Sequence, residues 1–142
     1  MTNQANSLSA SADPQGRELV KHSLAPTHPK YSSPSLDHWV LQLHGVAAAR
    51  IGDPQGVEAL ILEAVEGLKL TPVSSHTHFF GPGVSTVVIL SESHLSAHTW
   101  PELGYLHIDL VTCGKQFSSA KLEAVFRGAF DPEYLQLVQL LY

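Results

Sequence analysis

Residues 84–114 read VSTVVILSESHLSAHTWPELGYLHIDLVTCG, and the rest of the chain is interpreted around this stretch. The apolar runs Val87–Leu90 and Leu106–Val111 are typical of two β-strands. Between them, Ser91–Glu102 is rich in serine, histidine and glutamate, and we expect it to form a loop at one end of a sheet, where functional residues often lie. Cys113 is the only cysteine, and from composition alone a buried, inert thiol is favoured.

The composition excludes several classes of protein. A chain of 142 residues that is 44% apolar is long enough for one domain with a core. Its net charge is −5, and its eight Lys and Arg residues are scattered, so we expect no nucleic-acid partner. Because neither a long apolar run nor a signal-peptide pattern is present, we expect no membrane segment and predict a cytoplasmic protein.

The sequence divides into an extension and one domain. Residues 1–36 hold seven serines and four of the nine prolines but few large apolar groups, so burial cannot offset the entropy of ordering them. We therefore predict a disordered N-terminal extension over residues 1–36 and a folded domain over residues 37–142. We attach no function to the extension.

The order of elements within the domain predicts an α+β fold. Strands are expected at residues 39–45, 73–80, 84–90, 105–112 and 134–142, and helices at residues 53–68 and 118–130. Asp53 is the expected cap of the first helix. This order predicts a two-layer α/β sandwich in which two helices cover one face of a largely antiparallel sheet. Since many strand positions are apolar on both sides, the other face is expected to pair with the sheet of a second copy.

The histidines invite a metal-site hypothesis. His76 and His78 share one strand face, and His94 and His98 lie four residues apart. However, the chain has neither a cysteine pair nor a His-Glu-x-x-His motif, which are the usual signatures of zinc. We therefore expect no metal, and ordinary hydrogen-bonding or solvated histidines.

Nucleophilic residues form a second candidate group. Ser85, Ser93, His98 and Cys113 can converge if their strands are neighbours. The Gly-x-Ser-x-Gly motif of the α/β-hydrolases is absent. A cysteine hydrolase that uses Cys113 and His98 stays open on spacing alone, although nothing specific supports it.

A resemblance to a known family goes further than these patterns. Residues 91–105, SESHLSAHTWPELGY, with Gly83-Val84-Ser85 before them and Cys113-Gly114 after them, closely resemble the prokaryotic pyruvoyl-dependent S-adenosylmethionine decarboxylases. The resemblance implies that the chain cleaves itself between Glu92 and Ser93 into fragments 1–92 and 93–142. Ser93 would thereby become a covalent pyruvoyl group, the cofactor of the enzyme.

The resemblance also implies roles in the chemistry. Ser85 would support the tetrahedral intermediate of cleavage, and His98 would take the α-proton during elimination. The pyruvoyl group from Ser93 would form a Schiff base with the substrate amine and withdraw electrons as carbon dioxide leaves. Cys113 matches the proton donor of the family, which replaces the expectation of an inert thiol.

Two further positions are implied to bind substrate. Glu102 matches a carboxylate that holds the ribose hydroxyls, and Phe79 matches an aromatic residue that stacks on adenine. Because the family pattern has a proline closer to the aromatic residue than Pro82 is to Phe79, Phe79 and Phe80 can exchange roles.

The sequence thus predicts an adenosylmethionine decarboxylase that serves spermidine synthesis, with S-adenosylmethionine and a second copy of the chain as partners. The first alternative is an ornithine or arginine decarboxylase on the same fold with the same pyruvoyl chemistry. The second is a partner subunit that neither cleaves itself nor catalyses a reaction. Glu102 and Phe79 favour the nucleoside substrate, and the intact set of Ser85, Ser93, His98 and Cys113 argues against an inert subunit.

Overall fold

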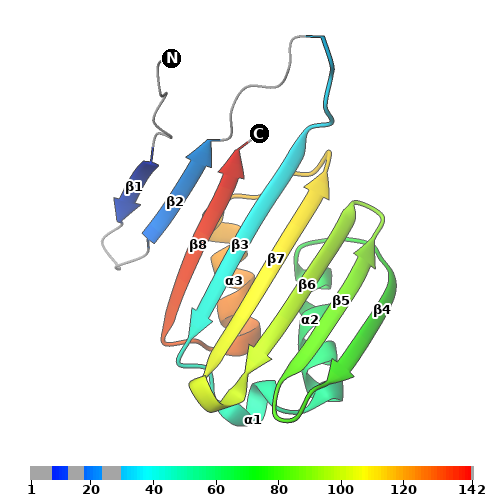
Figure 1. The fold of residues 1–142 in the computed structure, drawn as a ribbon, viewed down its shortest axis with the longest axis vertical. Helices are drawn as coiled ribbons and strands as arrows, with labels where there is room; N and C mark the ends of the chain where they lie inside the picture. Colours follow the sequence, from blue (N-terminus) through cyan, green and yellow to red (C-terminus); the bar gives the residue numbers. More distant parts are fainter. Residues whose placement is uncertain (1–7, 13–17, 24–29, 142) are drawn as a thin grey trace.

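The computed structural model describes residues 8–12, 18–23 and 30–141. Within them, eight strands form one sheet in the order β1-β2-β8-β3-β7-β6-β5-β4 (Figure 1). The strands are β1 Leu8–Ala12, β2 Glu18–Ser23, β3 Leu36–His44, β4 Pro72–Phe79, β5 Val84–Leu90, β6 Ser93–Trp100, β7 Tyr105–Cys113 and β8 Tyr134–Leu141. The helices are α1 Ala48–Ile51, α2 Pro54–Gly67 and α3 Ser119–Phe130, with a short 3₁₀ helix η1 at Pro101–Leu103.

Helices α2 and α3 cover one face of the sheet, behind the strands in Figure 1. The Asp53 carboxylate caps α2 by accepting a hydrogen bond of 2.8 Å from the Gly56 N–H, as the sequence predicts. One stripe of α2 and one of α3 are fully buried against the strands, at Val57, Ile61, Val65, Leu122, Phe126 and Phe130. The prediction of an α+β sandwich with two covering helices and a largely antiparallel sheet is confirmed.

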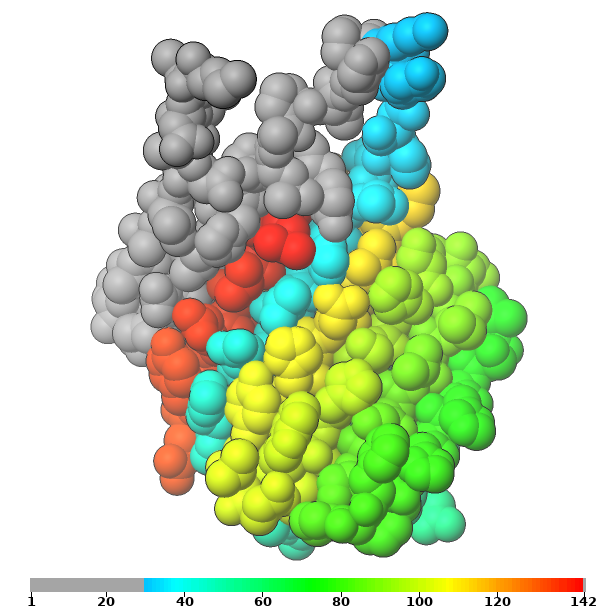
Figure 2. Space-filling view, in the orientation of Figure 1, coloured from blue at the N-terminus to red at the C-terminus, as the bar shows by residue number. Residues whose placement is uncertain are grey.

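No helix among the described residues covers the opposite face of the sheet, which is the face seen in Figure 2. Side chains alternate along the strands, so that Trp39, for example, is buried under the helices while its neighbours face the other way. Among the large apolar side chains on the uncovered face, Val87, Ile89 and Trp100 expose 38%, 47% and 40% of their surfaces. Ser85 and His98 of the candidate site lie on this uncovered face, since they alternate with buried neighbours on β5 and β6.

The central polar segment is a strand rather than a loop, so the prediction of a loop over Ser91–Glu102 is wrong. Residues Ser93–Trp100 form β6, which pairs with β5 on one side and β7 on the other. Its inward positions are Leu95, Ala97 and Thr99, all buried. Because two of these three side chains are small or polar, the alternation is too weak in hydrophobicity to be recognised from sequence.

The N-terminal segment also differs from its prediction. Residues 1–7, 13–17 and 24–29 lie outside the described residues, but β1 and β2 are described, and the expectation of disorder does not hold for them. Strand β2 pairs in parallel with β8, and β1 pairs antiparallel with β2. The backbone N–H and C=O groups at the edge of β8 provide pairing partners that require no large apolar side chains, so composition did not indicate these strands.

Candidate active site

The predicted site residues lie in two groups at opposite ends of β6. Ser85, His98 and Glu102 lie at the end where β6 meets η1. Glu92, Ser93 and Cys113 lie at the other end, where a short turn joins β5 to β6. We call these the histidine end and the scissile end, respectively.

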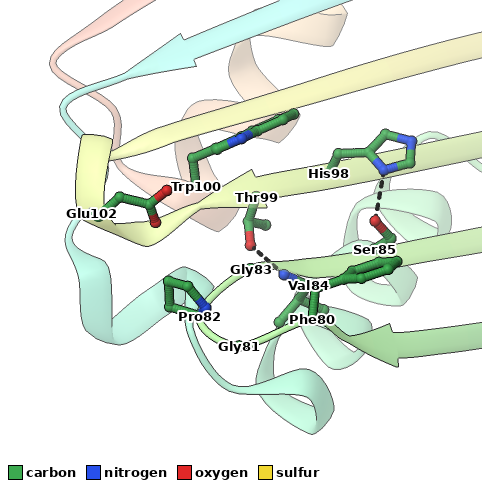
Figure 3. Close-up of a pocket in the computed structure, with 10 residues that line it drawn as sticks. All are labelled: Phe80, Gly81, Pro82, Gly83, Val84, Ser85, His98, Thr99, Trp100 and Glu102. Carbon is green, nitrogen blue, oxygen red and sulfur yellow. Dashed lines mark hydrogen bonds between the residues drawn. The ribbon is translucent and has the colours of Figure 1, made fainter.

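At the histidine end, Ser85 and His98 form a direct pair across β5 and β6. The Ser85 Oγ and His98 Nδ1 atoms are 2.7 Å apart, within hydrogen-bond distance (Figure 3). This contact fixes the ring of His98 through one nitrogen, which leaves Nε2 as the atom for proton transfer. His107 lies opposite His98 on β7. Burial and the neighbouring His98 lower the pKa of His107 from 6.5, and Asp109 opposes this change.

A cavity of about 340 Å³ opens beside this pair. Its lining residues come from the β4–β5 connection, β5, β6 and η1: Phe80, Gly81, Pro82, Gly83, Val84, Ser85, His98, Thr99, Trp100 and Glu102 (Figure 3). An aromatic ring, a carboxylate and a Ser-His pair therefore share one concave surface, which is a suitable composition for a site that binds a small molecule.

Thr99 holds the wall of this cavity in place. Its buried hydroxyl accepts a hydrogen bond of 2.9 Å from the Val84 N–H and donates one of 2.8 Å to the Ile51 carbonyl. At Gly83, a Cβ atom would lie 2.7 Å from the Thr99 carbonyl oxygen, closer than Cβ contacts occur. The close approach of the Gly83 backbone to β6 therefore depends on glycine, and it fixes the start of the strand that carries Ser85.

Phe80 and Trp100 are the aromatic residues that line the cavity, whereas Phe79, the residue first expected from the resemblance, does not line it. On β4, Thr77 pairs with the buried Thr86, so Thr77 and Phe79 face the helix side. Phe80 follows on the other face, where its ring packs edge-on against His78 at 4.5 Å between centroids. Of the two phenylalanines that the sequence left as alternatives, Phe80 is therefore the one that lines the cavity.

At the scissile end, the carbonyl of Glu92 is already bound by a donor. The Cys113 N–H donates a hydrogen bond of 2.7 Å to the Glu92 oxygen. Ser93, the next residue, has a φ of 151°, a positive value that non-glycine residues rarely adopt and that costs backbone energy. The Cys113 thiol is exposed, so the expectation from composition that it is buried is wrong.

The two ends do not meet within one chain. Five steps along β6 separate Ser93 from His98, a distance of about 16 Å at the usual rise of about 3.3 Å per residue. The structure therefore brings Ser85 to His98, and Ser93 to Cys113, but it does not bring the two pairs together in one copy. Of the four residues that the sequence grouped together, Ser85 and His98 lie at the histidine end, and Ser93 and Cys113 lie at the scissile end.

Two other histidines, His38 and His94, flank Asp109 on the sheet. The Nε2 atoms of His38 and His94 lie 2.7 Å and 3.3 Å from the two carboxylate oxygens of Asp109. In the part of the chain that the structure describes, no group of three or more His, Cys, Asp or Glu side chains is arranged to hold a metal ion. The helices of this part are also all too short or too polar to cross a membrane.

Sequence reasoning missed several residues of the site. Thr99 and Trp100 belong to the quoted stretch, but no role followed from their residue types alone. The available signal was the two-residue repeat of a β-strand. It places Trp100 on the same face of β6 as His98, and Thr99 on the buried face. Thr71, which contacts Glu92, had no signal in the sequence, because it lies 21 positions away in a connecting segment.

Comparisons with known proteins give matches over most of the chain. The family model described as S-adenosylmethionine decarboxylase matches residues 37–141. A Methanococcus maripaludis protein named S-adenosylmethionine decarboxylase proenzyme is 44% identical over 104 residues, which cover 72% of this chain and 85% of the relative. A protein of the same name from Archaeoglobus fulgidus is 37% identical over 97 residues, or 68% and 87% of the two chains. The crystal structure of the adenosylmethionine decarboxylase from Aquifex aeolicus superposes with a TM-score of 0.68 at 31% identity, covering 76% of this chain and 90% of that one.

Proposed function

The chain belongs to the S-adenosylmethionine decarboxylase family, and on this premise we propose that it cleaves itself between Glu92 and Ser93 to make its own pyruvoyl cofactor. It is an enzyme that decarboxylates S-adenosylmethionine for polyamine synthesis, and it is made as a proenzyme. The names of the relatives favour this substrate over ornithine or arginine.

The cleavage chemistry requires only groups of this chain and water. The Ser93 hydroxyl attacks the Glu92 carbonyl carbon, the C–N bond breaks, and an ester to Ser93 Oγ forms while the Ser93 nitrogen becomes an amine. Removal of the Ser93 α-proton then breaks the Cβ–Oγ bond and releases Glu92 as a carboxylate. The enamine that remains rearranges to an imine, and water converts it to a pyruvoyl group with loss of ammonia.

One observation carries this proposal: the Cys113 N–H already binds the carbonyl that Ser93 would attack, at 2.7 Å. A backbone donor in this position stabilises the negative charge that develops on the oxygen in the tetrahedral intermediate. The positive φ of Ser93 adds support, because cleavage of the bond before this residue relieves its backbone strain.

The histidine end supplies the groups for proton transfer. His98, oriented by Ser85, is suited to remove the α-proton of Ser93 during elimination. In catalysis, the pyruvoyl group when formed supplies an electron sink for the loss of carbon dioxide. The exposed Cys113 thiol is the proposed proton donor to the product, and Glu102 and Phe80 are the proposed contacts for ribose and adenine.

We further propose that a complete site forms between two copies. In one chain, His98 is about 16 Å from Ser93, which is too far for proton transfer. An isologous dimer whose uncovered sheet faces pack together, with the strands of the two copies running in opposite directions, would set the histidine end of one copy over the scissile end of the other. The exposed Val87, Ile89 and Trp100 on this face support such an interface.

Mass spectrometry of the purified protein tests the cleavage. The expected result is two fragments, residues 1–92 and 93–142, whereas Ser93→Ala should stay a single chain. Cleavage of the alanine variant at the same bond would refute the serine mechanism. A wild-type chain that stays intact would refute the proposed function itself.

A mixture of two inactive variants tests the shared site. In a hybrid dimer of His98→Ala and Ser93→Ala chains, the intact Ser93 of the first faces the intact His98 of the second. Co-expression should therefore yield cleavage of the His98→Ala chain, which is slow when that variant is made alone. If co-expression does not accelerate its cleavage, the two ends do not act across an interface.

A further inference from the structure

The turn that contains the scissile bond is held by a threonine from a distant segment. Thr71, just before β4, accepts a hydrogen bond of 2.9 Å from the Ser91 N–H through its carbonyl oxygen. Its own N–H donates to Glu92 Oε2 at 3.1 Å, and its hydroxyl donates to Glu92 Oε1 at 3.2 Å. Thr71 therefore binds the backbone of one turn residue and both carboxylate oxygens of the next.

These contacts hold Glu92 in its charged form. Partial desolvation acts to raise the pKa of Glu92, but hydrogen bonds from Thr71 and the Glu92 N–H, with the nearby positive charge of Lys115, lower it overall. Lys115 is kept near the turn because its ammonium donates a hydrogen bond of 2.6 Å to the Lys69 carbonyl. The Thr71 donors thus face a carboxylate, and hydrogen bonds to a charged partner are stronger than neutral ones.

Glu92 is held on its other side as well. Its carbonyl accepts the hydrogen bond from the Cys113 N–H, on the central part of the sheet. Thr71 binds the side chain, and Cys113 binds the main chain, so neither the residue nor its peptide plane can rotate freely. Ser93 consequently keeps its unfavourable φ of 151° and cannot relax to an ordinary strand conformation.

We propose that Thr71 is a positioning residue for self-cleavage: through Glu92, it holds the scissile carbonyl against the Cys113 N–H, within reach of Ser93. This role rests on the proposed function, since it concerns the same bond. Thr71 touches none of the reacting atoms. Because Thr71 engages both Glu92 carboxylate oxygens, that carboxylate anchors the turn to Thr71.

The test compares cleavage rates of variants whose hydroxyl is removed or retained. Thr71→Val keeps the branched shape and the backbone N–H but loses the hydroxyl, and cleavage should slow roughly 5- to 50-fold, as for loss of one charge-assisted hydrogen bond. Thr71→Ser restores the hydroxyl and should cleave within about twofold of wild type. Cleavage is followed by intact mass and gel on freshly made full-length chain.

A matched control removes a similar bond elsewhere. The Ser75 hydroxyl, also near the start of β4, donates a hydrogen bond of 2.6 Å to the Glu58 carboxylate. Glu58 lies on α2, far in sequence from the turn that contains the Glu92–Ser93 bond. Ser75→Ala should therefore cleave at the wild-type rate. Thermal unfolding of each variant in the uncleavable Ser93→Ala background shows that any change in rate is not a loss of fold.

A double-mutant cycle separates positioning from a general structural role. In a Glu92→Ala chain the anchor is gone, so adding Thr71→Val should slow cleavage no further. The Thr71 inference is overturned if the Thr71→Val chain cleaves as fast as wild type, if its effect adds fully to that of Glu92→Ala, or if Ser75→Ala is equally slow. The proposed function would survive each of these results, because it fails only if the wild-type chain does not cleave before Ser93.

Discussion

Replacing Thr99 by valine should destabilise the domain through two backbone groups. The Thr99 hydroxyl is the hydrogen-bond partner of the Val84 N–H and of the Ile51 carbonyl, and all three residues are buried. Valine has the same shape but no polar atom, so the cavity wall keeps its packing while both backbone groups lose their partner. The effect therefore isolates hydrogen bonding from volume.

The expected magnitude follows from these two bonds. Each buried backbone group left without a partner costs about 1–3 kcal/mol, and the added methyl group recovers about 1 kcal/mol through burial. We expect Thr99→Val to lower the free energy of unfolding by about 1–5 kcal/mol. For a chain of this size, that corresponds to a fall of about 3–20 °C in melting temperature.

The assay is urea and thermal unfolding in the Ser93→Ala background, where the chain stays in one piece. Ser75→Ala is the control, because the Ser75 hydroxyl donates to the Glu58 carboxylate at an exposed position, so its removal leaves no buried group without a partner. That variant should lose about 1 kcal/mol or less. If Thr99→Val costs no more than Ser75→Ala, the hydroxyl of Thr99 does not hold the cavity wall.

Two other predictions concern substrate binding and pH. Phe80→Ala should lower kcat/KM for S-adenosylmethionine about 3- to 10-fold through lost stacking, whereas Phe79→Ala should change it less than about twofold; the reverse order would restore Phe79 as the aromatic contact. Because the pKa of His107 is lowered in the folded state, the unfolded chain binds a proton at this ring more tightly than the folded chain does. The neutral ring's contribution to the free energy of unfolding is therefore complete above pH 6.5 and is lost as the pH falls through the lower pKa of the folded state. His107→Gln should therefore flatten the fall in unfolding free energy between about pH 7 and pH 5, and an unchanged slope would contradict the role of this ring.

Much of the fold could be predicted because its signals are local. The helix at α2 begins at a capping aspartate and buries a stripe that recurs every three to four residues, and both signals are visible in a short window. Strand β6 could not be predicted this way, because its inward side chains include alanine and threonine. Its place in the middle of the sheet depends on pairing with β5 and β7, which no local pattern shows.

Phe79 and Phe80 show how a difference of one residue escapes sequence reasoning. Phe79 and Phe80 are identical in chemistry, and only the register of β4 against β5 decides which ring faces the cavity. Since side chains alternate between faces along a strand, a one-residue change in register would exchange the two rings. The pairing of Thr77 with Thr86 settles the register and places Phe80 beside Ser85.

The sequence by itself determined which chemical groups this protein has: the residues of the 84–114 stretch carry the resemblance to a decarboxylase family, and that family is confirmed. Only the tertiary structure decided where these groups lie. An extended strand moves the chain about 3.3 Å per residue, so Ser93 and His98, close in sequence, stand at opposite ends of β6. Conversely, strand pairing and the turn before β6 bring Thr71, Glu92 and Cys113 together from three separate segments, because backbone hydrogen bonds act between residues that sequence distance keeps apart.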